Sequence, residues 1–175
     1  ITVSEEEAVL FMRELRAAGV RITGGSSLKN TAMICELKQN AQALEKGKTV
    51  GGAMRAPITM DNPYGGFYFY AQHLVEMVCE VFGRYPKSVC AFSAPKTLNV
   101  IFRYENFDVA GTFCEEMYSY YAVRYAEKGV QGGKVDLSDT KAFYTEFDEF
   151  YKLLCNEAQT VSYDDFISPV FIMNA

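Results

Sequence analysis

The stretch from Tyr64 to Gly83 constrains the fold of this chain more than any other. It opens with a Gly-Gly pair, contains the single histidine, His73, and closes on a glycine. Apolar residues recur within it at helical steps: Phe67, Tyr70, Ala71, Leu74, Val78 and Val81. This spacing places them on one stripe of an α-helix, and Gly83 stands where a left-handed residue would end that helix. We therefore expect a central helix whose flank presents His73 to a cleft.

The overall charge narrows the possible partners. The chain has 175 residues and a formal net charge of −5 at pH 7, and 49% of its residues are hydrophobic. This length suffices for one domain with a proper core. The negative charge argues against nucleic acid or an anionic membrane as a partner. Gln72, His73, Glu76 and Glu80 interrupt the longest apolar window, so we expect no membrane-spanning helix.

The cysteines favour a reducing, cytoplasmic location. There are five, which is an odd number, and no two form a C-x-x-C pair. With one histidine in the chain, no zinc-like set of ligands can be assembled, and we expect no metal site. Buried free thiols are the simplest interpretation.

The N-terminal segment has the pattern of half an α/β unit. Ser4 and Glu7 form a capping box that starts a helix, and Gly19 ends it. Residues 20–23 are expected to form a short strand, followed by a Gly-Gly-Ser-Ser loop that lacks the spacing of a phosphate-binding turn. We interpret residues 1–27 as a remnant of a preceding α/β domain and residues 28–175 as a C-terminal domain.

The remaining pattern predicts the α+β class, with a mostly antiparallel, open sheet and helices packed on one face. The expected elements are a helix at 30–46, an extended segment at 50–60, strands at 88–94, 98–104, 107–115, 118–126 and 134–137, a helix from Ser138, and a last helix from Ser162 that is interrupted or restarted at Ser168-Pro169. The helix from Ser138 should bury one apolar face, made of Phe143, Phe147, Phe150, Tyr151 and Leu154.

One predicted strand suggests assembly. Tyr118 and Tyr120 should face one side of it, and Tyr121, Val123 and Tyr125 the other. If all helices cover the same side, the second side needs a cover, and a second copy of the sheet is the simplest one. We expect a homo-oligomer through the open sheet face; the alternative is an exposed amphipathic tyrosine face.

The order of these segments resembles the glucose–fructose oxidoreductase / inositol dehydrogenase (Gfo/Idh/MocA) family. The similarity is to its C-terminal domain, preceded by the last helix and strand of its Rossmann domain. The matching segments are Arg21 to Gly25, Leu37 to Gly47, Val50 to Arg55, Gly65-Gly66 with His73 to Glu76, and Phe82 to Val89. The resemblance covers nearly the whole chain, and it rests on the order and spacing of these segments.

The resemblance implies an NAD- or NADP-dependent dehydrogenase of a sugar, polyol or related carbinol. The dinucleotide would bind to the Rossmann half, so this chain alone is expected to bind no cofactor and to be inactive. His73 would act as a general base or hydrogen-bond donor at the reacting hydroxyl. Lys29, Asn62 and Tyr64 are candidate substrate-binding residues. The alternatives are a half-buried structural histidine and, for Asn62 and Tyr64, ordinary turn chemistry.

One position departs from the family. Where members often carry an acid four residues before the histidine, this chain has Phe69. An aromatic ring cannot orient or stabilise an imidazolium as a carboxylate does. This departure favours the rival hypothesis of a non-catalytic small-ligand-binding or scaffold module. A small-ligand sensor domain with no redox role is a third possibility.

Overall fold

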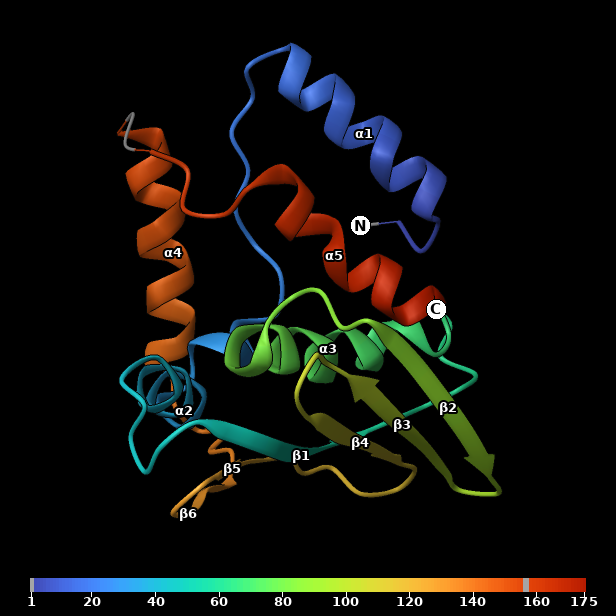
Figure 1. The fold of residues 1–175 in the computed structure, drawn as a ribbon. Coiled ribbons are helices and arrows are strands. Elements are labelled where there is room, and N and C mark those ends of the chain that lie inside the picture. The colour runs from blue at the N-terminus through green and yellow to red at the C-terminus, as the bar shows by residue number, and fades with distance from the viewer. Residues whose placement is uncertain (1, 156–157) are drawn as a thin grey trace.

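A six-stranded sheet organises the computed structural model, which describes residues 2–155 and 158–175 (Figure 1). The strand order is β2-β3-β4-β1-β5-β6. The strands are β1 (Thr49–Pro57), β2 (Ser88–Ala94), β3 (Thr97–Arg103), β4 (Asp108–Cys114), β5 (Tyr121–Ala126) and β6 (Gly129–Lys134). The pairing of β1 with β4 is parallel, and the other four pairings are antiparallel. The predicted α+β class with a mostly antiparallel sheet is confirmed.

Within the described residues, six helical segments accompany the sheet. They are α1 (Glu5–Ala17), the 3-10 turn η1 (Ser27–Asn30), α2 (Ala32–Gln42), α3 (Tyr68–Phe82), α4 (Lys141–Leu154) and α5 (Tyr163–Asn174). Helices α2 and α3 lie against one face of the sheet (Figure 1). No helix among the described residues covers the opposite face, where Tyr121 and Tyr125 are 38% and 40% exposed (Figure 1). The predicted placement of these two residues on one face of β5 is confirmed.

The central helix forms where the glycine-bounded stretch predicted it. Its stripe residues Ala71, Leu74 and Val78 are fully buried in the main core. Gly83 follows the helix with a φ of +111°, a conformation that residues with a side chain rarely adopt. Strand β1 approaches α3 closely because Gly52 has no side chain; a Cβ built there would lie 2.2 Å from Cζ of Phe82.

The strand predicted at residues 20–23 is not formed. In the described part of the chain no strand pairs with this segment, and a lone strand cannot satisfy its backbone groups. Side chains bind it instead: the Gln159 side chain accepts from the Ile22 N–H at 2.8 Å, and the Tyr163 hydroxyl donates to the Val20 carbonyl at 2.7 Å. Of the predicted helix and strand in this segment only the helix, α1, forms, and it packs on α5 through a small core that includes Ala8 and Met12.

The aromatic stripe of α4 was predicted to be buried, and this prediction is wrong. All five of its side chains are exposed by between 51% and 71%: Phe143, Phe147, Phe150, Tyr151 and Leu154. Helix α4 extends away from the sheet on the side of α2 and contacts mainly η1 at its start (Figure 1). Periodicity therefore identified an apolar face correctly, but it could not show that the rest of the described chain leaves that face uncovered.

Several predicted boundaries also move. Helix α2 ends at Gln42 rather than near 46. The chain leaves the helix because the buried Arg124 guanidinium donates hydrogen bonds to the carbonyl oxygens of Glu45 and Gly47, at 2.9 and 2.7 Å. Strand β5 begins at Tyr121, which leaves Tyr118 outside it, and the strand predicted at 134–137 lies instead at 129–134.

Helix α5 continues through Pro169, so the prediction that it is interrupted or restarted at Ser168-Pro169 is wrong. The proline ring removes the N–H that would bond to the carbonyl of Asp165. The Ser168 hydroxyl donates to that carbonyl at 2.8 Å, and the Arg84 guanidinium donates to it at 3.1 Å. The helix continues because these two donors replace the missing one.

Candidate functional site

The imidazole of His73 lies on the flank of α3 and is half-buried. Its Nδ1 is 2.6 Å from the Ser26 hydroxyl oxygen, which comes from the loop before η1. The rings of Tyr70 and Tyr120 stand at 6.4 and 6.2 Å from the imidazole, centroid to centroid, and Tyr120 is nearly perpendicular to it. Burial lowers the pKa of His73 from 6.5, so the ring is neutral at neutral pH.

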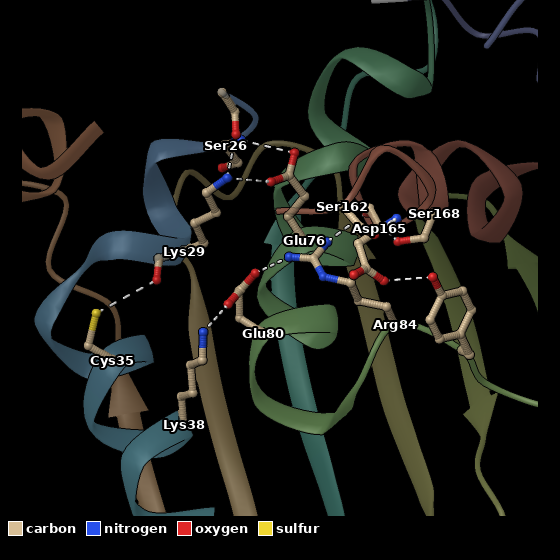
Figure 2. Close-up of polar contacts among 12 residues, drawn as sticks. Ser26, Lys29, Cys35, Lys38, Glu76, Glu80, Arg84, Ser162, Asp165 and Ser168 are labelled. Atoms are coloured by element: carbon tan, nitrogen blue, oxygen red, sulfur yellow. Dashed lines mark hydrogen bonds and ion pairs between the residues drawn. The ribbon is translucent and has the colours of Figure 1, made fainter. Parts of the chain in front are cut away.

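One turn further along α3, Glu76 holds the loop in place. Glu76 is only 6% exposed, and its carboxylate accepts a hydrogen bond from the Ser26 backbone N–H at 2.9 Å (Figure 2). Gly25 allows this approach, because a Cβ there would lie 2.4 Å from the carboxylate and the residue has a φ of +105°. Burial raises the pKa of the Glu76 carboxyl, and the charge of Lys29 opposes that shift.

Lys29 is bound internally. Its Nζ lies 3.5 Å from Oε2 of Glu76 and donates a hydrogen bond to the Gly24 carbonyl. Figure 2 shows the lysine of η1 reaching toward the Glu76 carboxylate from across the loop. The residue proposed as a substrate contact from the sequence is therefore the ion-pair partner of a buried carboxylate, with a side chain 15% exposed.

Asn62 and Tyr64 lie in the loop before α3. The Asn62 side-chain oxygen accepts the Tyr64 N–H at 2.9 Å, which is the turn chemistry held open as the alternative. Tyr64 is 80% exposed, and its ring lies 5.9 Å from the Phe69 ring, centroid to centroid.

Two cavities meet at the Lys29–Glu76 ion pair. One cavity has a volume of about 330 Å³ and is lined by Tyr64, Phe69 and Glu76, together with Thr2 and Val3. Lys29 lines the other, of about 360 Å³, whose wall is mostly polar and includes Asn30 and Glu80. The structure thus brings Tyr64 to the same cavity as Glu76 and places Lys29 at the other one. His73 lines neither of these two cavities, although the sequence predicted that it faces a cleft.

A second polar group ties the helices around this region together. The Glu80 carboxylate lies 2.7 Å from the Lys38 ammonium and also pairs with the Arg84 guanidinium. That guanidinium donates a further hydrogen bond to the Asp165 carbonyl of α5 (Figure 2). An ion pair therefore joins α2 to α3, and a hydrogen bond from Arg84 to the Asp165 carbonyl joins this group to α5, on the side of the cavity lined by Lys29.

Sequence reasoning did not identify Ser26 or Glu76 as parts of this region. Glu76 carried a signal, since a carboxylate amid the buried positions of an apolar helix needs a specific partner. Ser26 carried little signal, because serine is common in loops and its contact with His73 spans 47 positions of the chain.

No metal or membrane site emerges from the described residues. Within 2–155 and 158–175, no three His, Cys, Asp or Glu side chains gather as a set of metal ligands. The same residues include no helix with the length and apolarity needed to cross a bilayer. All five cysteines are free, and burial raises the pKa of the Cys79 thiol to about 12, which makes it unreactive.

Comparison with known proteins supports the fold and leaves the sequence family unassigned. No family model matches the sequence, and no curated protein matches it. Solved structures do match. A candidate myo-inositol dehydrogenase from Sinorhizobium meliloti 1021 superposes with a TM-score of 0.83 at 12% identity, over 99% of this chain and 67% of that one.

Two further neighbours are similar at the same level. The scyllo-inositol dehydrogenase of Lactobacillus casei gives a TM-score of 0.78 at 12% identity, over 97% of this chain and 64% of that one. The aldose–aldose oxidoreductase of Caulobacter crescentus, complexed with glycerol, gives 0.76 at 10% identity, over 99% and 65%. The chain spans about two thirds of the length of such neighbours, and it shares their fold.

Proposed function

We propose that this chain is the substrate-binding part of an NAD- or NADP-dependent oxidoreductase that acts on a sugar, a polyol or a related carbinol. The observation that carries the proposal is the neutral, half-buried imidazole of His73 on α3, a helix that also borders the cavity lined by Tyr64 and Glu76. The fold shared with inositol dehydrogenases and an aldose–aldose oxidoreductase supports it.

The described residues do not fit the pyrophosphate of a dinucleotide. The candidate cradle is the loop at residues 24–27, but its Ser26 N–H is already bound to the Glu76 carboxylate, and that anion would repel phosphate. We therefore assign the nicotinamide cofactor to a domain outside these residues. When bound there, it would accept or supply the hydride.

The residues of this chain would bind and orient the substrate. His73 would meet the reacting oxygen, and the exposed Tyr64 phenol and the Asn62 amide would meet other hydroxyl groups from the loop before α3. Lys29 would act indirectly, because its ammonium is engaged by Glu76 and Gly24. Its proposed part is to hold the wall between the two cavities.

The open sheet face is the proposed surface of a homo-oligomer. Tyr121 and Tyr125 of β5 are partly exposed on it, and Phe92 of β2 is 61% exposed. A second copy of the same face would cover these side chains. Light scattering should then give a mass above that of one chain, and Tyr121→Lys with Tyr125→Lys should return it to that mass. A wild-type monomer at high concentration would contradict the oligomer.

A direct assay tests the proposed reaction. The full-length protein is mixed with NAD or NADP and a panel of inositols, aldoses and linear polyols, and nicotinamide absorbance is followed. Reduction of either cofactor with at least one panel member is expected. No reduction across the panel, in a preparation that binds nicotinamide nucleotide, would overturn the proposal.

Phe69 favours a second candidate, a binding module without catalysis. This ring lines the cavity at the position where the resembled family carries an acid, so no carboxylate from that position meets His73. A binding module would become more stable to heat when a member of the panel binds to it, and the gain would depend on the ratio of the ligand concentration to its Kd. It would reduce no cofactor. That pair of results would select this candidate.

A further inference from the structure

The Ser26 hydroxyl has two neighbours that define the direction of its hydrogen bonds. The backbone N–H of Leu28 donates to the hydroxyl oxygen at 3.3 Å. The hydroxyl hydrogen needs an acceptor of its own, because Ser26 is 2% exposed. Among the described residues, the acceptor within reach is Nδ1 of His73, at 2.6 Å.

We propose that Ser26 is a positioning residue that holds His73 in the tautomer with its proton on Nε2, so that the imidazole presents an N–H donor. A neutral imidazole carries one ring proton, and a ring nitrogen that accepts a hydrogen bond cannot also carry it. The ring is neutral because it is buried. An Nδ1 that accepts from Ser26 therefore leaves the proton on Nε2.

Ser26 can impose this arrangement because it is itself fixed. Its backbone N–H donates to the Glu76 carboxylate at 2.9 Å, and that carboxylate is paired with Lys29 (Figure 2). The same hydroxyl caps η1. A series of contacts thus runs from Lys29 through Glu76 and Ser26 to the imidazole, and the last hydrogen bond has a set direction.

The aromatic neighbours of the ring do not compete for Nδ1. Tyr70 and Tyr120 face it as rings, and burial raises the pKa of the Tyr120 phenol to about 12, so that phenol carries no charge at neutral pH. The position four residues earlier on α3, which could supply a carboxylate to the ring, holds Phe69. The Ser26 hydroxyl thus hydrogen-bonds to Nδ1, the ring nitrogen to which such a carboxylate would otherwise bind.

The consequence for chemistry rests on the proposed function. An Nε2–H donates a hydrogen bond to the oxygen of a carbinol or carbonyl, and it stabilises negative charge that develops there. It cannot take the hydroxyl proton. Of the two roles that the sequence left open for His73, the structure favours the donor and assigns proton removal to another group.

The tautomer can be read directly because the chain contains a single histidine. The ¹⁵N-labelled chain is studied by long-range ¹H–¹⁵N correlation at mildly alkaline pH, where the ring is neutral. The expected spectrum has an unprotonated Nδ1 and a protonated Nε2. The spectrum of the wild-type chain is decisive without any variant: a protonated Nδ1, or two averaged nitrogen signals typical of a free imidazole, would overturn the proposal.

Three variants test the part played by Ser26. Ser26→Ala removes the hydroxyl and should give averaged nitrogen signals, whereas Ser26→Thr keeps a hydroxyl and should restore the wild-type pattern. Ser27→Ala, the same change one residue later, should leave the pattern unchanged. An unchanged pattern in a folded Ser26→Ala chain would contradict the role of the serine. The spectra need no substrate or cofactor, so failure of the oxidoreductase assay would leave this result standing, and the reverse also holds.

Discussion

The Glu76 carboxylate and the Lys29 ammonium lie 3.5 Å apart, from Oε2 to Nζ, with side chains that are 8% and 15% exposed. The pair joins α3 to η1 and stands between two cavities. Glu76 also binds the backbone of Ser26, which contacts His73. The position of the only imidazole therefore depends on an ion pair that sequence reasoning did not predict.

Replacing Lys29 by methionine should destabilise the fold more than the same change at Lys38. Glu76 would lose its cation inside the protein, and breaking a buried pair costs about 3–5 kcal/mol when no other donor remains. Because the Ser26 N–H remains, we expect about 2–3 kcal/mol. The Lys38 side chain is 44% exposed, so its loss should cost about 0–1 kcal/mol. Chemical denaturation measures both values, and equal losses would contradict a special role for Lys29.

Gly25→Ala should be more destabilising than Gly65→Ala. Both glycines have a positive φ, of +105° and +126°, so both variants carry backbone strain. Only the Cβ at Gly25 meets a neighbour, the Glu76 carboxylate at 2.4 Å, whereas nothing lies within 4 Å of the one at Gly65. Because of this overpacking, Gly25→Ala should lower the free energy of unfolding by about 1–3 kcal/mol more than Gly65→Ala does. Urea unfolding measures both values. If the two variants unfold alike, the loop does not pack against Glu76 as described.

The pKa of His73 should lie below 6.5, because burial disfavours the imidazolium. As the pH falls below 6.5, the unfolded chain takes up a proton on this ring before the folded chain does. Stability contributed by the neutral ring is therefore present above 6.5 and is lost as the pH falls toward the folded pKa. The ¹H shift of the ring against pH gives the value directly. His73→Gln should remove this part of the pH dependence, and a folded pKa at or above 6.5 would contradict the prediction.

The sequence predicted those parts of the fold whose signal is local. The stripe around Leu74 and the glycine after Phe82 defined α3, and Ser162 caps α5 through the Asp165 N–H as its spacing indicated. The hairpin strands β2, β3 and β4 lie close to their predicted positions. Each of these features depends on residues a few positions apart.

The errors arise where distant contacts decide. Phe147 belongs to an apolar stripe, but whether the stripe is covered depends on what α4 faces, and the helix alone carries no information on that. Residues 20–23 have strand-like composition but no partner strand in the described chain. In the candidate site, the sequence predicts roles for His73 and Tyr64 from their residue types and positions. Their relation to Ser26 and Glu76 required the folded arrangement.

The most direct test of the central claim is the effect of His73→Ala on turnover by the full-length protein. If the imidazole donates a hydrogen bond to the reacting oxygen, kcat/KM for the best sugar or polyol should fall by about 10²–10³. Lys96→Ala, on an exposed hairpin turn, serves as the control and should be unchanged. Turnover by His73→Ala equal to that of the wild-type protein would contradict the account.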